Sequence, residues 1–289
     1  YYMSYYKRTA DALLQDLLDA FGAVLIEGPK WCGKTTTASQ LANSILRMQD
    51  PSLREEYLVT AKTKPSILLN GATPRLIDEW QDAPMLWDAV RTVVDDRQIP
   101  GQFILTGSNA VDKSQIHHSG VGRIARLRML PMSLWESGDS TGEISLSELF
   151  LAPDKIGALN KLALPVLAFV VCRGGWPKAL QKKTEKAALL QVTEYYKAIT
   201  NSDISRVDNV KRDAERAKRI MRSYARHQGS QASIATILAD ISTNEPEDVS
   251  DETIDAYLTA LRKIFVIEDM PAWNPNLRSK TAVRTSDTR

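Results

Sequence analysis

The stretch Gly28-Pro-Lys-Trp-Cys-Gly33-Lys34-Thr35 matches the pattern G-x-x-x-x-G-K-[ST] of a phosphate-binding loop. The apolar residues 23–27 before it predict a buried strand, and residues 36–42 after it predict the first turns of a helix. Two glycines let the backbone bend so that successive N–H groups point at phosphate oxygens, and the helix N-terminus adds its positive dipole end. A glycine turn before an ordinary helix is the alternative, but both flanking elements favour a loop that binds a nucleoside triphosphate.

The side chains of this loop have distinct expected roles. Lys34 can reach the β- and γ-phosphates, and the Thr35 hydroxyl can ligate Mg²⁺. We therefore expect ATP and Mg²⁺ to bind together. The residues expected to contact the nucleotide are Gly28, Pro29, Lys30, Trp31, Cys32, Gly33, Lys34, Thr35 and Thr36.

Two adjacent acids end a second apolar run, Leu76-Ile-Asp78-Glu79. We expect Asp78 to hold Mg²⁺ through its water shell and Glu79 to polarise a water for in-line attack on the γ-phosphate. A strand that merely ends in surface charge is the alternative, but the phosphate loop upstream favours the catalytic interpretation. Acids with two different roles indicate hydrolysis rather than binding alone.

Small hydroxyl residues end another predicted strand, Phe103–Ser108. In sheets with a phosphate loop, the strand between the loop strand and the acidic strand carries a polar group that senses the γ-phosphate and orients the water. Thr106 or Ser108 could serve in this way, and the pattern does not choose between them. The alternative is a glycine turn with two solvated hydroxyls.

Two other features have a structural and a functional interpretation. Arg123 lies with Arg126 in a predicted strand, where such charges can simply protect a sheet edge from aggregation. Alternatively, Arg123 reaches the γ-phosphate of a neighbouring subunit. The turn that ends at Pro177 is either a corner between helices or a segment whose proline and backbone close over the adenine.

Composition places the chain among ordinary soluble globular proteins. It has 289 residues, of which 43% are hydrophobic and 25% charged, and its net charge is +2, so any basic surface must be local. Cys32 lies inside the phosphate loop far from Cys172, which favours a reducing cytoplasm over a disulfide. The N-terminus lacks the apolar region of a signal peptide. Residues 162–172 are too short to span a bilayer and predict a core helix.

Strands alternating with helices from the phosphate loop onward predict an α/β domain on a mainly parallel sheet. The predicted strands are residues 23–27, 66–69, 75–79, 102–106 and 123–129, with a polar solvated insertion at 49–64. Residues 133–201 predict helix throughout, broken at Gly174-Gly175. Helices at 209–228, 231–241 and 251–264, followed by a strand at 265–268, predict a winged helix.

Basic residues are frequent between Arg206 and Arg226, although four acids in or just before this stretch dilute them: Asp203, Asp208, Asp213 and Glu215. A solvated helix face is the simpler interpretation. DNA binding gains support from the predicted winged helix, but its third helix begins with Asp251 and Glu252, which would repel phosphates.

Taken together, these motifs resemble the prokaryotic AAA-type ATPases whose C-terminal half is known only as a domain of unknown function. Further segments carry the resemblance: Gly122-Arg-Ile-Ala-Arg-Leu, Pro131-Met-Ser-Leu-Trp-Glu136, Gly174-Gly-Trp-Pro177 and Pro271-Ala-Trp-Asn-Pro-Asn-Leu-Arg-Ser279. The resemblance implies an AAA-like nucleotide domain with a helical lid, then a winged helix, then a restriction-endonuclease-like domain that these residues do not include. It implies that Lys34 and Thr35 bind phosphate and Mg²⁺, that Asp78 and Glu79 hold Mg²⁺ and activate water, that Arg123 is the family's Gly-Arg arginine, and that Pro177 lies against adenine.

We therefore expect a P-loop AAA-like parallel sheet with a helical lid, followed by a winged-helix domain. The expected boundaries are 1–130 for the nucleotide domain, 131–202 for the lid and 203–289 for the winged helix. The expected function is Mg²⁺-dependent ATP hydrolysis coupled to rearrangement of the lid and the winged helix, in a cytoplasmic protein that can form homo-oligomers. A slow nucleotide-gated switch or scaffold, and a DNA-binding regulator, are the alternatives.

Overall fold

The computed structural model describes residues 5–109, 118–159, 162–244 and 249–270. The chain divides into two compact units, an N-terminal unit of residues 1–193 and a C-terminal unit of residues 194–289. The boundary falls inside helix α8 (Glu185–Ala198). The three domains expected from the sequence remain a prediction.

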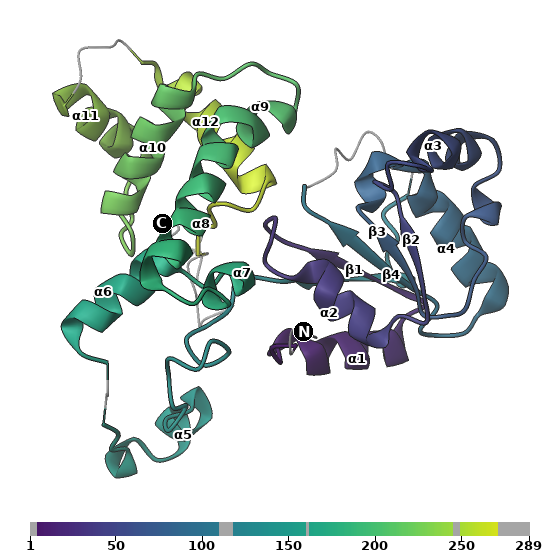
Figure 1. The fold of residues 1–289 in the computed structure, drawn as a ribbon, viewed down its shortest axis with the longest axis horizontal. Coiled ribbons are helices and arrows are strands. Elements are labelled where there is room, and N and C mark those ends of the chain that lie inside the picture. Colours follow the sequence, from purple (N-terminus) through teal and green to yellow (C-terminus); the bar gives the residue numbers. More distant parts are fainter. Residues whose placement is uncertain (1–4, 110–117, 160–161, 245–248, 271–289) are drawn as a thin grey trace, which may run out of the picture. The chain divides into compact units, whose positions relative to one another are not determined.

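A five-stranded parallel sheet forms the centre of the N-terminal unit (Figure 1). Its strand order is β2-β3-β4-β1-β5, so β4 lies between β1 and β3. This arrangement confirms the α/β sheet and the place expected for the strand with the hydroxyl residues. The strands are β1 (Ala23–Glu27), β2 (Ser44–Arg47), β3 (Arg75–Asp78), β4 (Phe103–Gly107) and β5 (Ile124–Arg128).

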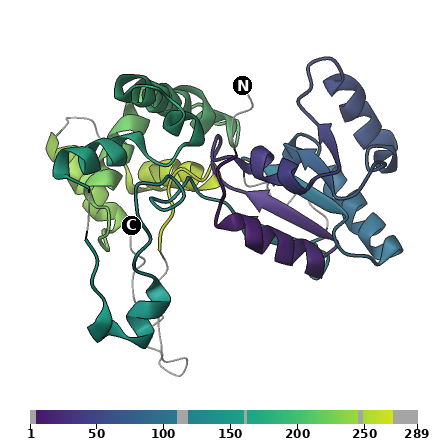
Figure 2. The ribbon, with the colours of Figure 1, turned by 60° about the horizontal axis from the view of Figure 1, so that its bottom comes forward.

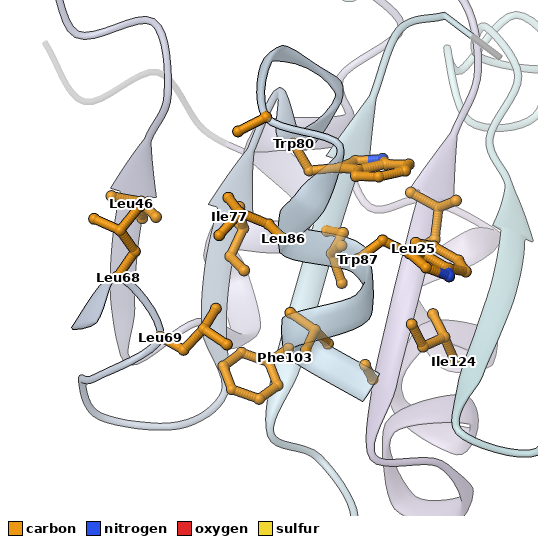
Figure 3. Close-up of a cluster of buried hydrophobic side chains, with 14 of the residues drawn as sticks. Leu25, Leu46, Leu68, Leu69, Ile77, Trp80, Leu86, Trp87, Phe103 and Ile124 are labelled. Carbon is orange, nitrogen blue, oxygen red and sulfur yellow. The ribbon is translucent and has the colours of Figure 1, made fainter. Parts of the chain in front are cut away.

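Helices cover both faces of this sheet (Figure 1, Figure 2). Ala23 and Leu25 of β1 join one buried cluster, whereas Val24 and Ile26 join the other, as the two-residue period of a strand requires. Figure 3 shows the first cluster, in which Trp87 packs over the sheet. The helices are α1 (Ala10–Ala20) and α2 (Lys34–Leu41) on one face, and α3 (Arg54–Thr63) and α4 (Met85–Arg97) on the other. Burial on both faces explains why β1 is apolar at four successive positions.

Two expectations in this unit are wrong. The edge strand next to β3 is β2, and the run Ser66-Ile-Leu-Leu69, predicted as a strand, instead forms the end of a 3₁₀ helix (Pro65–Ile67) and the turn that follows it. The expected polar insertion contains helix α3, whose first turn holds Glu55 and Glu56 and whose last turn holds Lys62. These charges complement the helix dipole, but α3 fully buries only one residue, Ala61, and so lacks the apolar stripe that marks a helix in a sequence.

The segment between the sheet and the C-terminal unit is less helical than expected. Its helices are α5 (Leu146–Leu151), α6 (Leu164–Arg173), α7 (Pro177–Leu180) and the first part of α8, with turns and irregular structure over most of the described residues from 133 to 145. Helix α6 is not the core helix that its apolar sequence predicts, because Leu164 is 79% exposed and Val171 is 73% exposed. In the described parts of the chain, no helix is both long and apolar enough to cross a membrane.

The C-terminal unit is helical in its described residues. It contains α9 (Ile204–Arg206), α10 (Ala214–Arg226), α11 (Ile234–Asn244) and α12 (Asp251–Lys263), and the last three pack against one another. The three predicted helices are thus present, with shifted ends. The strand predicted at 265–268 is not formed, since described residues 265–269 adopt a turn and irregular backbone. The winged helix itself remains a prediction.

Several basic residues of α10 and the segment before it are paired with acids. Arg212 contacts Asp208 at 2.6 Å, and Lys218 contacts Glu215 at 2.6 Å. Arg226 contacts Asp240 on α11 at 3.0 Å. These pairs favour the solvated helix face over a phosphate-binding surface.

Candidate nucleotide-binding site

The phosphate loop connects β1 to α2, and glycine is needed at both of its ends. A Cβ on Gly28 would lie 2.0 Å from the carbonyl oxygen of Met129, which is a clash with backbone. Gly33, the residue before α2, has a φ of 105°, which L side chains rarely adopt. The sequence spacing of the two glycines therefore corresponds to two distinct backbone requirements.

Lys34 folds back over the start of the loop and is 5% exposed. Its Nζ donates to the carbonyl oxygens of Gly28 at 2.9 Å and Pro29 at 2.8 Å. An ammonium has three N–H donors, so these two bonds leave one for a phosphate oxygen. Burial lowers the pKa of Lys34, while the nearby Glu79 and Asp78 carboxylates act in the opposite direction. An anionic ligand would further favour the charged form of this side chain.

Three elements bring oxygen atoms together at the Asp78 carboxylate. Its Oδ1 accepts hydrogen bonds from Thr35 Oγ1 at 2.6 Å and from Thr106 Oγ1 at 2.7 Å. Thr35 lies in the first turn of α2, and Thr106 lies near the end of β4 with no exposed surface. Because the strands are parallel, the carboxyl ends of β3 and β4 lie on the same side of the sheet as the phosphate loop, which follows the carboxyl end of β1.

Glu79 sits beside this cluster in a left-handed backbone conformation, with φ 56° and ψ 49°. Its N–H donates to Thr106 Oγ1 at 3.2 Å, and its Oε2 accepts from Ser108 Oγ at 2.9 Å. Gln81 Nε2 also donates to this carboxylate oxygen. Thr106 therefore contacts Asp78 and Ser108 contacts Glu79. Gln81 is a residue of the site that the sequence analysis missed, although it follows Glu79 by only two positions.

These oxygens suit Mg²⁺, which prefers hard oxygen ligands and takes only one or two from the protein when nucleotide phosphates supply the others. The Thr35 hydroxyl and the Asp78 carboxylate are such a pair. No group of three or more His, Cys, Asp or Glu side chains among the described residues could hold a metal ion. The arrangement thus fits Mg²⁺ carried in by a nucleotide.

Arg123 does not join the site of its own chain. It precedes β5, whose first residue pairs with the first residue of β1, whereas the phosphate loop follows the last residue of β1. Arg123 Nε contacts Asp95 Oδ1 at 2.7 Å, and its side chain is about half exposed. The neighbouring Arg126 contacts Glu27 at 3.1 Å and lies over the Trp87 ring.

Pro177, in contrast, lies beside the phosphate loop. Its Cγ is 3.7 Å from the position that a Cβ on Gly33 would take. The preceding Trp176 packs against the buried cluster that includes Cys32, and Lys178 lies over the ring of Trp31. The turn before α7 thus borders the loop expected to hold a nucleotide.

Comparisons with known proteins agree with this geometry. Residues 20–137 match a family model described as an AAA domain, and residues 165–287 match a domain of unknown function (DUF8612). With the parallel sheet and the intact phosphate loop, the first match defines an AAA-like α/β fold of the nucleotide-binding P-loop class. Asp78, Glu79, Thr106 and Ser108 all lie within the matched segment.

Two curated relatives are the uncharacterized proteins Rv2008c of Mycobacterium tuberculosis and Mb2031c of Mycobacterium bovis. Each is 23% identical over 273 residues, which cover 94% of this chain and 54% of the relative. The chain thus spans about half the length of the curated relatives it matches.

Among solved structures, the FIGL-1 AAA domain in complex with ADP aligns with a TM-score of 0.37 and 14% identity, over 89% of this chain and 88% of that chain. A DNA replication initiation factor aligns with a TM-score of 0.26 and 12% identity, over 89% and 92% of the two chains. Scores this low add nothing to the assignment.

Proposed function

We propose that this protein is a cytoplasmic, Mg²⁺-dependent ATPase of the AAA type. The observation that carries the proposal is the pairing of two acids with two hydroxyls at one sheet edge, Asp78 with Thr106 and Glu79 with Ser108. Thr35 of the phosphate loop joins the first pair. A binding loop alone would need only the first acid. The second acid, held by its own donors, is what hydrolysis requires. The free cysteines Cys32 and Cys172 support a reducing compartment.

In the proposed reaction, backbone N–H groups of the loop and the Lys34 ammonium bind the β- and γ-phosphates of ATP. Thr35 and Asp78 would hold Mg²⁺, which would neutralise charge on the phosphates. Glu79 accepts a proton from a water molecule whose oxygen attacks the γ-phosphorus in line. The bond between the γ-phosphorus and the bridging oxygen of ADP breaks, giving ADP and inorganic phosphate. Ser108 and Gln81 orient the Glu79 carboxylate toward that water.

The nucleotide state is proposed to alter the lid, residues 131–202, and through it the winged helix, residues 203–289. Pro177 supports the first part of this proposal because it borders Gly33 at the phosphate loop, where it can close over the adenine. Helix α8 supports the second part, since it continues without a break from one compact unit into the other.

The test combines isothermal titration with ATP or ADP and a steady-state assay of phosphate release. The wild-type protein should bind both nucleotides in the presence of Mg²⁺ and release phosphate from ATP. Lys34→Ala should abolish binding, because it removes the mobile charge that faces the phosphates. The control is Lys62→Ala, an exposed lysine on α3, which should bind normally. Binding without phosphate release would indicate the nucleotide-gated switch instead, and unchanged affinity in Lys34→Ala would refute the phosphate-loop assignment.

A further inference from the structure

Arg8 is a buried residue just before α1 that contacts the outer side of the phosphate loop. Its Nη1 donates to the carbonyl oxygen of Cys32 at 2.7 Å, and its Nη2 donates to that of Leu130 at 2.7 Å. Its Nε donates to Glu136 Oε1 at 3.0 Å. One guanidinium thus joins the residues before α1 to two segments that are distant in the sequence, the phosphate loop at Cys32 and residues 130–136. A guanidinium can do this because its donors form a planar fork, which a lysine ammonium lacks.

The bond to Cys32 determines the direction of a neighbouring N–H group. The peptide between Cys32 and Gly33 is trans, so its C=O and N–H point in opposite directions. With the Cys32 oxygen held by Arg8, the Gly33 N–H points away from Arg8. In a phosphate loop, the N–H groups that precede the helix are those that bind phosphate oxygens.

Glu136 explains why Arg8 is held in this position. It ends the segment Pro131-Met-Ser-Leu-Trp-Glu136, to which the sequence analysis gave no role. The two side chains are 4% and 3% exposed. Beyond its bond to Arg8, the Glu136 carboxylate accepts from the N–H groups of Thr9 and Ser133, each at 2.7 Å. A buried carboxylate with this many donors is fully satisfied, so the pair forms a fixed support.

We propose that Arg8 is a positioning residue for the nucleotide site, holding the Cys32–Gly33 peptide so that the Gly33 N–H faces the phosphates, with Glu136 holding Arg8. The inference rests on the proposed function, since it concerns the same phosphate site. Arg8 contacts the loop on its outer side. It affects phosphate binding by fixing the orientation of the Cys32–Gly33 peptide.

The test uses two probes, ADP and inorganic tripolyphosphate, each titrated calorimetrically with Mg²⁺ into folded protein well below its melting temperature. Tripolyphosphate engages the phosphate loop without the base or the sugar. Arg8→Lys keeps the charge but cannot reach three diverging acceptors. The double variant Arg8→Met with Glu136→Gln removes both charges, so that neither is left buried without its partner. The matched control is Arg54→Met with Glu55→Gln, which removes an exposed pair on α3.

Both Arg8 variants should lower the affinity for ADP and for tripolyphosphate by the same factor, about tenfold or more, because the lost contact is to the phosphates that both probes carry. The control should bind both probes like the wild type. A variant that melts at a lower temperature yet binds both probes normally would reduce Arg8 to a structural role and overturn the inference. Wild-type affinity in Arg8→Lys would also overturn it, since charge alone would then suffice. If the wild type binds neither probe, the proposed function fails first and the inference with it.

Discussion

At the scale of single residues, Glu79 is the position on which the proposed hydrolysis would depend. Its backbone is left-handed, which is uncommon for a residue other than glycine, and two side-chain donors hold its carboxylate. Glu79→Gln should keep ATP affinity, because the amide fills the same space and leaves Asp78 in place. It should lower phosphate release by about 10²-fold or more, because an amide cannot accept the proton from water. Titration and phosphate-release assays on the same preparation measure both effects. If the variant hydrolyses ATP at the wild-type rate, the base lies elsewhere, and Asp82 is the next residue to replace.

Glu136 gives a residue-scale prediction about pH. Burial raises the pKa of its carboxyl, but the hydrogen bonds from Ser133 and Thr9 and the Arg8 charge outweigh that effect, so the pKa lies below its ordinary value of 4.5. The unfolded state therefore takes up a proton at higher pH than the folded state does. The stabilising contribution of Glu136 is fully present above pH 4.5 and is lost as the pH falls through the folded-state pKa.

The measurement is urea unfolding of the wild type and Glu136→Gln between pH 3 and pH 8. The difference in free energy of unfolding should be constant near neutrality and should narrow below about pH 4.5. Glu55→Gln, at an exposed carboxylate, is the control and should differ little from the wild type. A wild-type advantage that grows on acidification would contradict the assignment.

At the scale of elements, the turn between α6 and α7 fixes Pro177 beside the phosphate loop. Met132 N–H donates to the Gly175 oxygen at 2.7 Å, and a Cβ on Gly175 would lie 1.9 Å from the Met132 oxygen. Gly175→Ala should therefore destabilise the protein by about 1–3 kcal/mol, since the Met132 atoms that the new Cβ would meet all belong to the backbone. Gly157→Ala is a matched control, because a Cβ there would meet nothing within 4 Å. Thermal unfolding of both variants measures the effect. Equal melting temperatures would mean that the turn can shift freely.

The elements predicted correctly are those whose signals are local. The strand before the phosphate loop and the helix after it follow from four apolar residues, two glycines and the loop motif. Strand β2 was missed because it has four residues at a sheet edge, and a short apolar run after Pro65 resembled a strand more closely. The support of the loop by Arg8 could not be predicted, because Arg8 and Glu136 are 128 positions apart and meet only in the fold. Likewise, the motifs placed two hydroxyls near two acids, but only the register of β4 against β3 assigns Thr106 to Asp78.

At the scale of the whole molecule, we propose that Arg123 acts on the nucleotide site of another subunit. It precedes the edge strand β5, at the end of the sheet away from its own phosphate loop. In the proposed assembly this edge would face the site of the next subunit, where an arginine can neutralise charge on the γ-phosphoryl group. Arginine fingers contribute on the order of 10³-fold or more in rate. Arg123→Ala should therefore reduce turnover sharply and leave nucleotide affinity nearly intact, as titration and phosphate release would show.

Among the described residues, the Arg123 side chain pairs with Asp95 at the surface and donates to the Val121 oxygen at 3.3 Å; the Asp95 pair supplies the matched control. Asp95→Asn removes that pair and keeps the arginine. If Arg123 acts in trans, this variant should turn over nearly as fast as the wild type, whereas a purely structural pair would make both variants equally slow.

Mixing two inactive variants provides the decisive measurement. Inactive Arg123→Ala and inactive Glu79→Gln subunits should recover part of the activity together, because some interfaces then combine an intact Glu79 with an intact Arg123. If the mixture stays inactive although the subunits co-assemble, or if the wild type is active as a monomer, Arg123 is an ordinary charge that protects an edge strand.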